Sequence, residues 1–220
     1  MNKKVEATLP ASLSDVAREH LERRAARIDP AAHAEDKKLQ TTLAALKIKP
    51  WPALLDIERD FGGLRFAEES EAWLLGTYAM AKKIPKRMTT KVDGTLLVCV
   101  GGNDTGRLFA DESGQIWDED AVAGTLLRRA ESMQRRLEKE AYGGNISELG
   151  QHSFKALAAS IDADAGSRAL GVPLVQVASD EIERIWQSDK LTVWRSTEDV
   201  RVFAKTAAAL AKAVAVLERP

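Results

Sequence analysis

The stretch TLLVCVGGNDTGRLFADESGQIW, residues 95–117, decides the fold of this chain. It begins with an apolar run of strand length, Thr95–Val100, and continues after a Gly- and Asn-containing turn with Arg107–Ala110. A second tight turn at Glu112–Gly114 leads into Gln115–Trp117. Short apolar runs separated by such turns are typical of antiparallel strands. The stretch therefore predicts a three-stranded meander.

Helical patterns flank this meander on both sides. A helix is predicted directly after it, because apolar residues keep helical spacing up to the glycines that follow Tyr142: Leu126, Ala130, Met133, Leu137 and Ala141. Three helices are predicted before it. The first is opened by a capping box at Ser12–Asp15 and stopped at Asp29–Pro30, and the second covers about 35–48. The third follows Pro52 and ends at Phe61-Gly62-Gly63. The Gly pair is expected to form a left-handed C-terminal cap, and residues 64–94 show a mixed pattern.

The last third of the chain repeats the middle in an alignment that needs no gap. In this alignment Leu97-Val98 matches Leu174-Val175, and Arg107-Leu108-Phe109 matches Arg184-Ile185-Trp186. A second helix is expected after this block, opened by Ser196 with Asp199 in capping-box register and carrying Phe203 and Leu217 on its apolar face. The segments 95–141 and 172–217 are thus expected to share one order of strands and helix.

These patterns predict an α+β fold, in which an antiparallel meander sheet is packed by amphipathic helices. We expect three parts: an N-terminal helical segment over residues 1–50, an α+β unit over 51–141, and a second, degenerate α+β unit over 142–220. The second unit lacks two glycines of the first, because Glu183 stands in the place of Gly106 and Leu191 in the place of Gly114.

Composition places the chain among globular proteins: 45% of its 220 residues are apolar and 30% are charged. Its 32 basic and 33 acidic residues sum to a net charge of -1, which gives no global basic excess for binding nucleic acid or an anionic membrane. The lone Cys99 lies in an apolar run, as expected of a buried residue in a reducing compartment. No secretory signal or membrane-spanning run is present, so we expect a cytoplasmic location.

Motifs for chemistry are scarce. His20, His33 and His152 lie in unrelated contexts, and no nucleophile elbow or zinc-ligand spacing accompanies them. The glycines of Gly101–Arg107 resemble a phosphate loop, but a strand rather than a helix is expected to follow, so a hairpin turn is the better interpretation. We therefore expect no catalytic residue, no cofactor and no metal. A carboxylate-dependent enzyme stays open as the least favoured alternative.

Acidic residues cluster in the expected turns and strand ends of the first unit, where residues 51–140 hold 16 acids against 13 bases. Acids are common in turns and before helices, so this placement has a purely structural interpretation as well. The functional interpretation is a docking face for a basic partner, for example a nuclease. The candidate partner-binding residues are Glu68, Glu69, Glu71, Asp104, Asp111, Glu112, Asp118, Glu119 and Asp120, with Trp73 as an aromatic anchor.

The helix ending in Phe61-Gly62-Gly63-Leu64, the strand Leu97–Gly101 and the hairpin Gly106–Trp117 together resemble the SUKH superfamily. The resemblance covers residues 51 to about 141. Members are α+β proteins, many of them immunity proteins of bacterial polymorphic toxin systems used in interbacterial competition, and others are regulators.

This resemblance implies an inhibitor that acts by protein–protein interaction: it binds a cognate toxin or effector and blocks the active site. It implies no catalytic residue and no direct contact with nucleic acid or membrane. A regulatory or scaffold protein of the same fold that binds a cellular partner is the alternative. The sequence leaves the oligomeric state and the toxin activity open.

Overall fold

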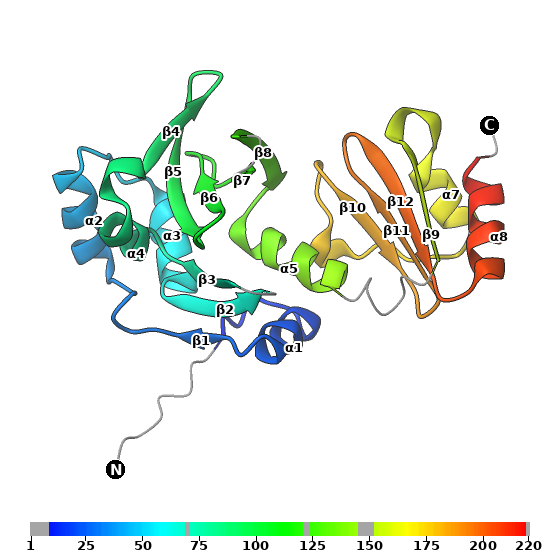
Figure 1. The fold of residues 1–220 in the computed structure, drawn as a ribbon, viewed down its shortest axis with the longest axis horizontal. Helices are drawn as coiled ribbons and strands as arrows, with labels where there is room; N and C mark the ends of the chain where they lie inside the picture. The colour runs from blue at the N-terminus through cyan, green and yellow to red at the C-terminus, as the bar shows by residue number, and fades with distance from the viewer. Residues whose placement is uncertain (1–8, 69–70, 121–123, 145–151, 219–220) are drawn as a thin grey trace, which may run out of the picture. The chain divides into compact units, whose positions relative to one another are not determined.

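A computed structural model describes residues 9–68, 71–120, 124–144 and 152–218 (Figure 1). The fold is α+β with antiparallel sheets, as the sequence predicts. The chain divides into two compact units, unit 1 over Met1–Gln134 and unit 2 over Arg135–Pro220, and each contains its own sheet.

The sheet of unit 1 has the strand order β1-β2-β3-β5-β6-β7-β8, and β4 pairs with the first half of β5. All pairs are antiparallel. Its strands are β1 (Arg27–Ile28), β2 (Leu64–Glu68), β3 (Glu71–Leu75), β4 (Thr89–Val92), β5 (Thr95–Gly102), β6 (Arg107–Ala110), β7 (Ile116–Asp120) and β8 (Thr125–Ala130). The predicted meander thus forms the centre of a larger sheet.

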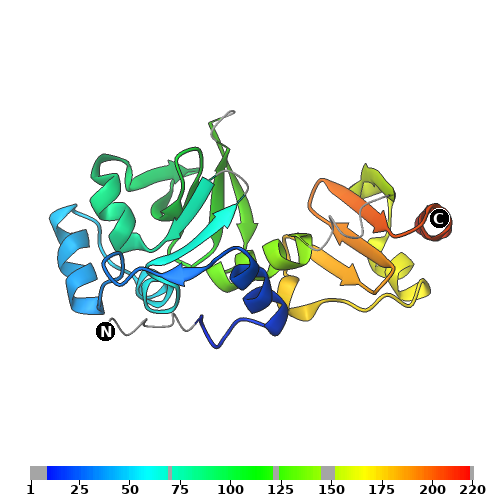
Figure 2. The same ribbon diagram turned by 60° about the horizontal axis from the view of Figure 1, so that its bottom comes forward.

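The helices of unit 1 are α1 (Asp15–Arg23), α2 (Asp36–Ala45), α3 (Pro52–Phe61) and α4 (Thr77–Lys83), with a 3-10 turn η1 (Pro85–Arg87). Helices α2, α3 and α4 pack on one another, and α3 and α4 also contact β5 (Figures 1 and 2). Strand β1 pairs with β2, so the described part of the segment 1–50 is built into unit 1.

Two helix ends test the sequence predictions. The first helix ends at Arg23 and not at Asp29, because Ala25 has a positive φ of 52° and the chain then pairs as β1 with β2. The helix α3 ends as predicted at the glycine pair, with Gly62 as its C-cap and Gly63 in the left-handed region at φ 78°.

The strand β8 occupies the segment where the sequence pattern predicts the start of a helix. Leu126 and Ala130 lie on this strand, and the helix α5 (Met133–Gly144) begins only afterwards. The spacing of Leu126, Ala130 and Met133 fits a helical period, but pairing with β7, as at Glu119↔Leu126, holds the segment extended. Asp118–Asp120 accordingly belong to β7 and do not precede a helix.

The sheet of unit 2 has the order β10-β11-β12-β9 and is antiparallel throughout. Its elements are β9 (His152–Leu157), the 3-10 turn η2 (Ala158–Ser160), α7 (Ala163–Ala169), the 3-10 turn η3 (Gln176–Ala178), β10 (Arg184–Gln187), β11 (Leu191–Arg195), β12 (Asp199–Ala204) and α8 (Ala207–Leu217). Helices α7 and α8 pack on each other and on the sheet, with Val193, Val202 and Leu217 in the core between them.

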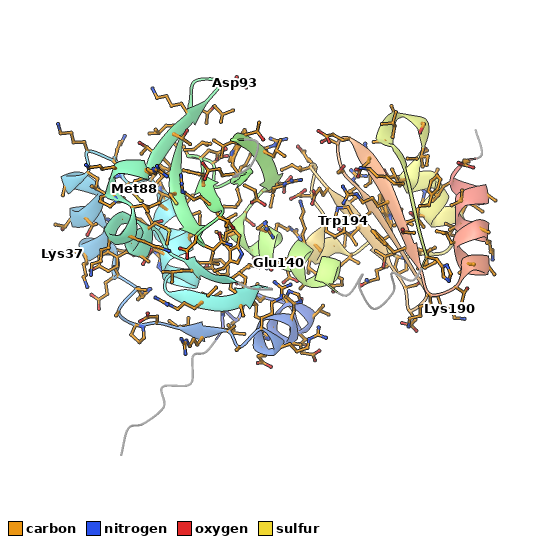
Figure 3. The ribbon with its side chains drawn as sticks, in the orientation of Figure 1. Lys37, Met88, Asp93, Glu140, Lys190 and Trp194 are labelled. Atoms are coloured by element: carbon orange, nitrogen blue, oxygen red, sulfur yellow. The ribbon has the colours of Figure 1, made fainter. Side chains whose placement is uncertain are left out.

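The neighbour of Val193 on β11, Trp194, points to the other face of this sheet (Figure 3). There it meets Gly143 of α5 so closely that a Cβ on Gly143 would lie 2.8 Å from the ring atom Cζ3. The repeat predicts core packing for both Trp117 and Trp194, and both are half-buried.

The last helix also starts later than predicted. Its N-cap is Thr206, whereas Ser196 and Asp199 close the turn between β11 and β12, where Ser196 N–H donates to Asp199 O at 2.8 Å. Phe203 lies on β12 for the same reason that Leu126 lies on β8. An alternating strand runs directly into an amphipathic helix, and the sequence pattern merges the two.

One turn has the same geometry in both units. Asn103 Oδ1 accepts hydrogen bonds from the N–H groups of Thr105 and Gly106, and Asp180 Oδ1 accepts them from Ile182 and Glu183. Asn103 and Asp180 are matched to each other by the gap-free alignment of the repeat. The main-chain N–H of the first residue also donates to the carbonyl of the fourth, at 3.0 Å for Asn103 and 2.8 Å for Asp180.

The strands that follow this turn, β6 and β10, begin at matched positions of the same alignment, Arg107 and Arg184. The strand before the turn differs, because β5 has eight residues whereas its counterpart keeps a single bridge, Leu174↔Trp186, followed by the 3-10 turn η3. Each segment is thus an antiparallel meander that leads into a helix, but four strands precede the helix in 95–141 and three in 172–217, so the predicted common order of strands is not met.

Candidate partner-binding surface

The strand register brings most of the predicted partner-binding residues to one end of the unit 1 sheet. The C-terminal ends of β2, β5 and β7 and the N-terminal ends of β3, β6 and β8 meet there, as the pairs Glu68↔Glu71, Gly102↔Arg107 and Asp120↔Thr125 show. We call this region the acidic end. It comprises residues 68, 71–73, 103–107 and 118–120.

Two of the predicted residues, Asp111 and Glu112, lie instead in the turn between β6 and β7, at the opposite end of these strands. Glu69 lies outside the described residues. Glu68, Glu71 and Asp120 are placed by their strands alone. Consecutive hairpin turns of a meander lie at alternate ends of the sheet, so the predicted order of β5, β6 and β7 already separates the turn at Asp111 and Glu112 from the turn at Asp104.

Three acids of the acidic end have basic partners. Asp104 accepts a hydrogen bond from Lys83 Nζ at 3.0 Å, on the exposed surface. Glu119 on β7 pairs with Arg107 on β6 at 3.3 Å, and Asp118 lies 3.9 Å from Arg129 on β8. The exposed pair between Lys83 and Asp104 stabilises the fold by at most about 1 kcal/mol, whereas Arg107 and Glu119 are half-buried.

Asp111 is buried and organises its own turn. Its Oδ1 accepts hydrogen bonds from the N–H groups of Ser113 and Gln115, at 2.9 and 3.0 Å, and from the Ser113 hydroxyl. Its Oδ2 accepts from Trp117 Nε1 at 3.2 Å. With its oxygens used inside the hairpin, Asp111 supports the fold, whereas its neighbour Glu112 is exposed.

Trp73 lies half-buried on β3, beside the turn that carries Asp104. A Cβ placed on Gly106 would lie 3.5 Å from the ring atom Cη2 of Trp73 and 3.5 Å from Asn103 Oδ1. The indole thus covers this turn with part of its surface and leaves part of it accessible at the acidic end.

The sequence interpretation missed a buried carboxylate at Glu58, on α3. Its side chain is fully buried, and its two oxygens accept N–H hydrogen bonds at 3.0 Å, Oε1 from Ala34 and Oε2 from Tyr78. Tyr78 lies in the first turn of α4, whose N-cap Gly76 has no side chain to accept such bonds. Glu58 therefore ties α3 to α4 and to the segment before α2.

Burial raises the pKa of Glu58 above 4.5, while the N–H bonds from Tyr78 and Ala34 and the charge of His33 act in the opposite direction. His33 Nδ1 lies 3.9 Å from Glu58 Oε1. One signal in the sequence could have identified this residue. Leu54, Ile57 and Phe61 form the apolar stripe of α3, and Glu58 is a carboxylate within that stripe.

The thiol of Cys99 is buried, and burial raises its pKa to about 12, so it is held in the unreactive thiol form.

Within the described ranges, His, Cys, Asp and Glu side chains form no group of three or more that could hold a metal ion. In the same ranges, no helix has the length and apolar character needed to cross a membrane.

Comparison with known proteins adds no identified relative: no family model, no curated protein and no solved structure matches this chain.

Proposed function

We propose that this chain is an immunity protein of the SUKH type, which binds a cognate toxin and blocks its active site. The observation that carries the proposal is the strand register of unit 1, which gathers the acid-rich segments and the half-buried Trp73 at one end of one sheet. An accessible aromatic side chain surrounded by charged residues is a common feature of protein-binding surfaces.

The described acids of the acidic end outnumber the bases paired with them. These acids are Glu68, Glu71, Asp104, Asp118, Glu119 and Asp120. Three bases, Lys83, Arg107 and Arg129, pair with acids of this set, so the sum over these residues is 3 minus 6, or -3. A face of this sign attracts a basic partner, such as a toxin whose own site binds phosphate.

The proposal requires a toxin gene beside the gene of this chain, and co-expression of the two tests it. We expect cells that express the toxin domain to survive only when this chain is also present. If they die at the same rate with and without it, the immunity proposal is wrong, and a regulatory or scaffold role with a cellular partner becomes the better account.

Charge reversal at one exposed turn acid tests the acidic end itself. Asp104→Lys should slow association with the toxin domain, more strongly at low salt, because rim charges act mainly on the association rate. Glu112→Lys is the matched control, since Glu112 is an exposed turn acid at the opposite end of β6. Equal association rates for the two variants would show that the acidic end is not part of the binding surface.

A further inference from the structure

The last strands of the two meanders, β8 and β12, differ in what lies beside them. In unit 2, β12 is covered on its outer side by β9, which pairs with it over six positions from Asp199↔Leu157 to Ala204↔His152. In unit 1, β8 is the end of the sheet order, and among the described residues its only strand partner is β7.

The two strands are equivalent by their position. Each is the last strand of its meander, and each ends in a fully buried alanine, Ala130 or Ala204. In both cases a helix begins shortly afterwards, at Met133 and at Ala207. The environment of β12 therefore indicates what the edge of β8 can accept, which is an antiparallel strand.

The strand β8 exposes an apolar side chain at this edge. Leu127 is 40% exposed, and Arg128 beside it is exposed. An exposed edge strand with an apolar side chain is a template for strand addition, and charged residues on it limit pairing with the wrong chain.

The charge of β8 argues against pairing with a second copy. Two β8 strands in antiparallel alignment would bring the adjacent Arg128 and Arg129 of both copies close together, and like charges on paired strands are destabilising. An acidic residue of a different chain would instead complement Arg128, and an apolar residue would complement Leu127.

We propose that the open edge of β8 binds an extended segment of the partner protein as an antiparallel strand, with an acidic side chain facing Arg128 and an apolar one facing Leu127. The identity of that partner as a toxin rests on the proposed function. The capacity of the edge to accept such a strand does not.

Hydrogen exchange of the full chain with synthetic peptides tests the edge without the toxin. The probe is a short peptide in which glutamates alternate with valines, and the control peptide has lysines in place of the glutamates. We expect the glutamate peptide to protect the amides of Thr125–Arg128, and to bind about fivefold more tightly than the lysine peptide, from the charge dependence of cross-strand pairs.

The variant Arg128→Glu should reverse this preference, and the amides of β12 should not change in any sample. The absence of peptide-dependent protection at β8, or protection that does not depend on the charge at position 128, would overturn the proposal. Protection that rises with protein concentration alone would assign the edge to a second copy and overturn it as well.

The co-expression result is independent of this outcome. If peptides protect the amides of β8 but the chain does not rescue cells from the toxin, the edge binds a strand and its partner is not the toxin. If the chain rescues cells but peptides do not protect β8, the immunity function is supported and the proposed binding at the edge is wrong.

Discussion

The turn before β6 and the turn before β10 use the same side-chain acceptor and the same main-chain bonds, but their fourth residues differ. In unit 1 that residue is Gly106, which lies beneath Trp73. In unit 2 it is Glu183, which lies 3.4 Å from the buried Lys139 Nζ. The side chain of Asn103 or Asp180 therefore determines the turn, while the fourth position is adapted to its surroundings.

The buried ion cluster of unit 2 has no counterpart in the turn of unit 1. Lys139 on α5 is 3% exposed and lies 2.9 Å from Asp180 and 3.4 Å from Glu183, so the turn is fixed to the helix by charge. Asn103 carries no charge. Unit 1 is instead joined around another buried group, Glu58.

The largest loss of stability from a single substitution is therefore expected in unit 2. Lys139→Met should lower the free energy of unfolding of this unit by about 3–5 kcal/mol, because the two carboxylates lose a buried cation. Unit-resolved hydrogen exchange in denaturant measures it. Lys155→Met is the control, since Lys155 pairs with Asp199 from a 65% exposed position and should cost less than about 1 kcal/mol. Similar losses for the two variants would contradict this description of the cluster.

The next largest loss of stability is expected in unit 1. Glu58→Ala should lower its free energy of unfolding by about 2–4 kcal/mol, because the buried N–H groups of Ala34 and Tyr78 lose their acceptor. The same hydrogen-exchange experiment should show no change in unit 2. Asp56→Ala, on the exposed side of α3, is the control. A change shared equally by both units would show that they do not unfold separately.

Glu58 should also give unit 1 a pH dependence. Its folded-state pKa is raised, so its stabilising contribution is complete below about pH 4.5 and is lost as the pH rises through the folded-state pKa. In Glu58→Gln this slope should disappear. A difference in unfolding free energy between wild type and variant that does not change above pH 4.5 would show that Glu58 titrates normally.

Exchanging the first residues of the two turns is expected to have a smaller and unequal effect. Asp180→Asn keeps the oxygen acceptor but removes the charge that Lys139 contacts, and should cost about 1.5–3 kcal/mol. Asn103→Asp keeps the acceptor where no buried cation lies close, and should change stability by less than about 0.5 kcal/mol. Denaturant unfolding of both variants checks the difference, and equal costs would mean that the charge of Asp180 has no special role.

The smallest changes in stability are expected for alanine substitutions at Gly106 and Gly114, the two glycines that the second unit lacks. Gly114 has a φ of 89°, and a Cβ on it would lie 3.2 Å from Ala53 Cβ, so Gly114→Ala should cost about 1–2 kcal/mol. At Gly106 the added Cβ meets only ordinary contacts, and Gly106→Ala should stay within about 0.5 kcal/mol of wild type. If Gly106→Ala were the more harmful change, the shared geometry of the two turns would be in doubt.

Strands bounded by turn residues were predictable from the sequence, and those that merge with a helix pattern were not. Thr95–Val100 and Arg107–Ala110 stand between Gly, Asn and Asp residues, and both predictions are confirmed. β8 and β12 run into amphipathic helices with no Pro or Gly between them, so a helical period extends across the boundary.

The hairpin from β4 to β5 carried a signal that was not used. Asp93 and Gly94 form its turn, both with positive φ, and the Asp-Gly pair is typical of two-residue turns (Figure 3). For the candidate site, the residue types were predictable, but the gathering of loops at one end of the sheet depends on strand order. Glu58 was missed because its role depends on the N–H groups of Ala34 and Tyr78, which are far from it in the chain.

We propose that this chain inhibits its toxin by forming a stoichiometric complex. The most direct test titrates the purified chain into the toxin domain that the proposal requires in the neighbouring gene, and measures the residual toxin activity. We expect this activity to fall linearly to zero at one equivalent of the chain. A toxin that stays fully active in an excess of the chain would contradict inhibition, and inactivation by much less than one equivalent would contradict a stoichiometric complex and indicate an enzyme.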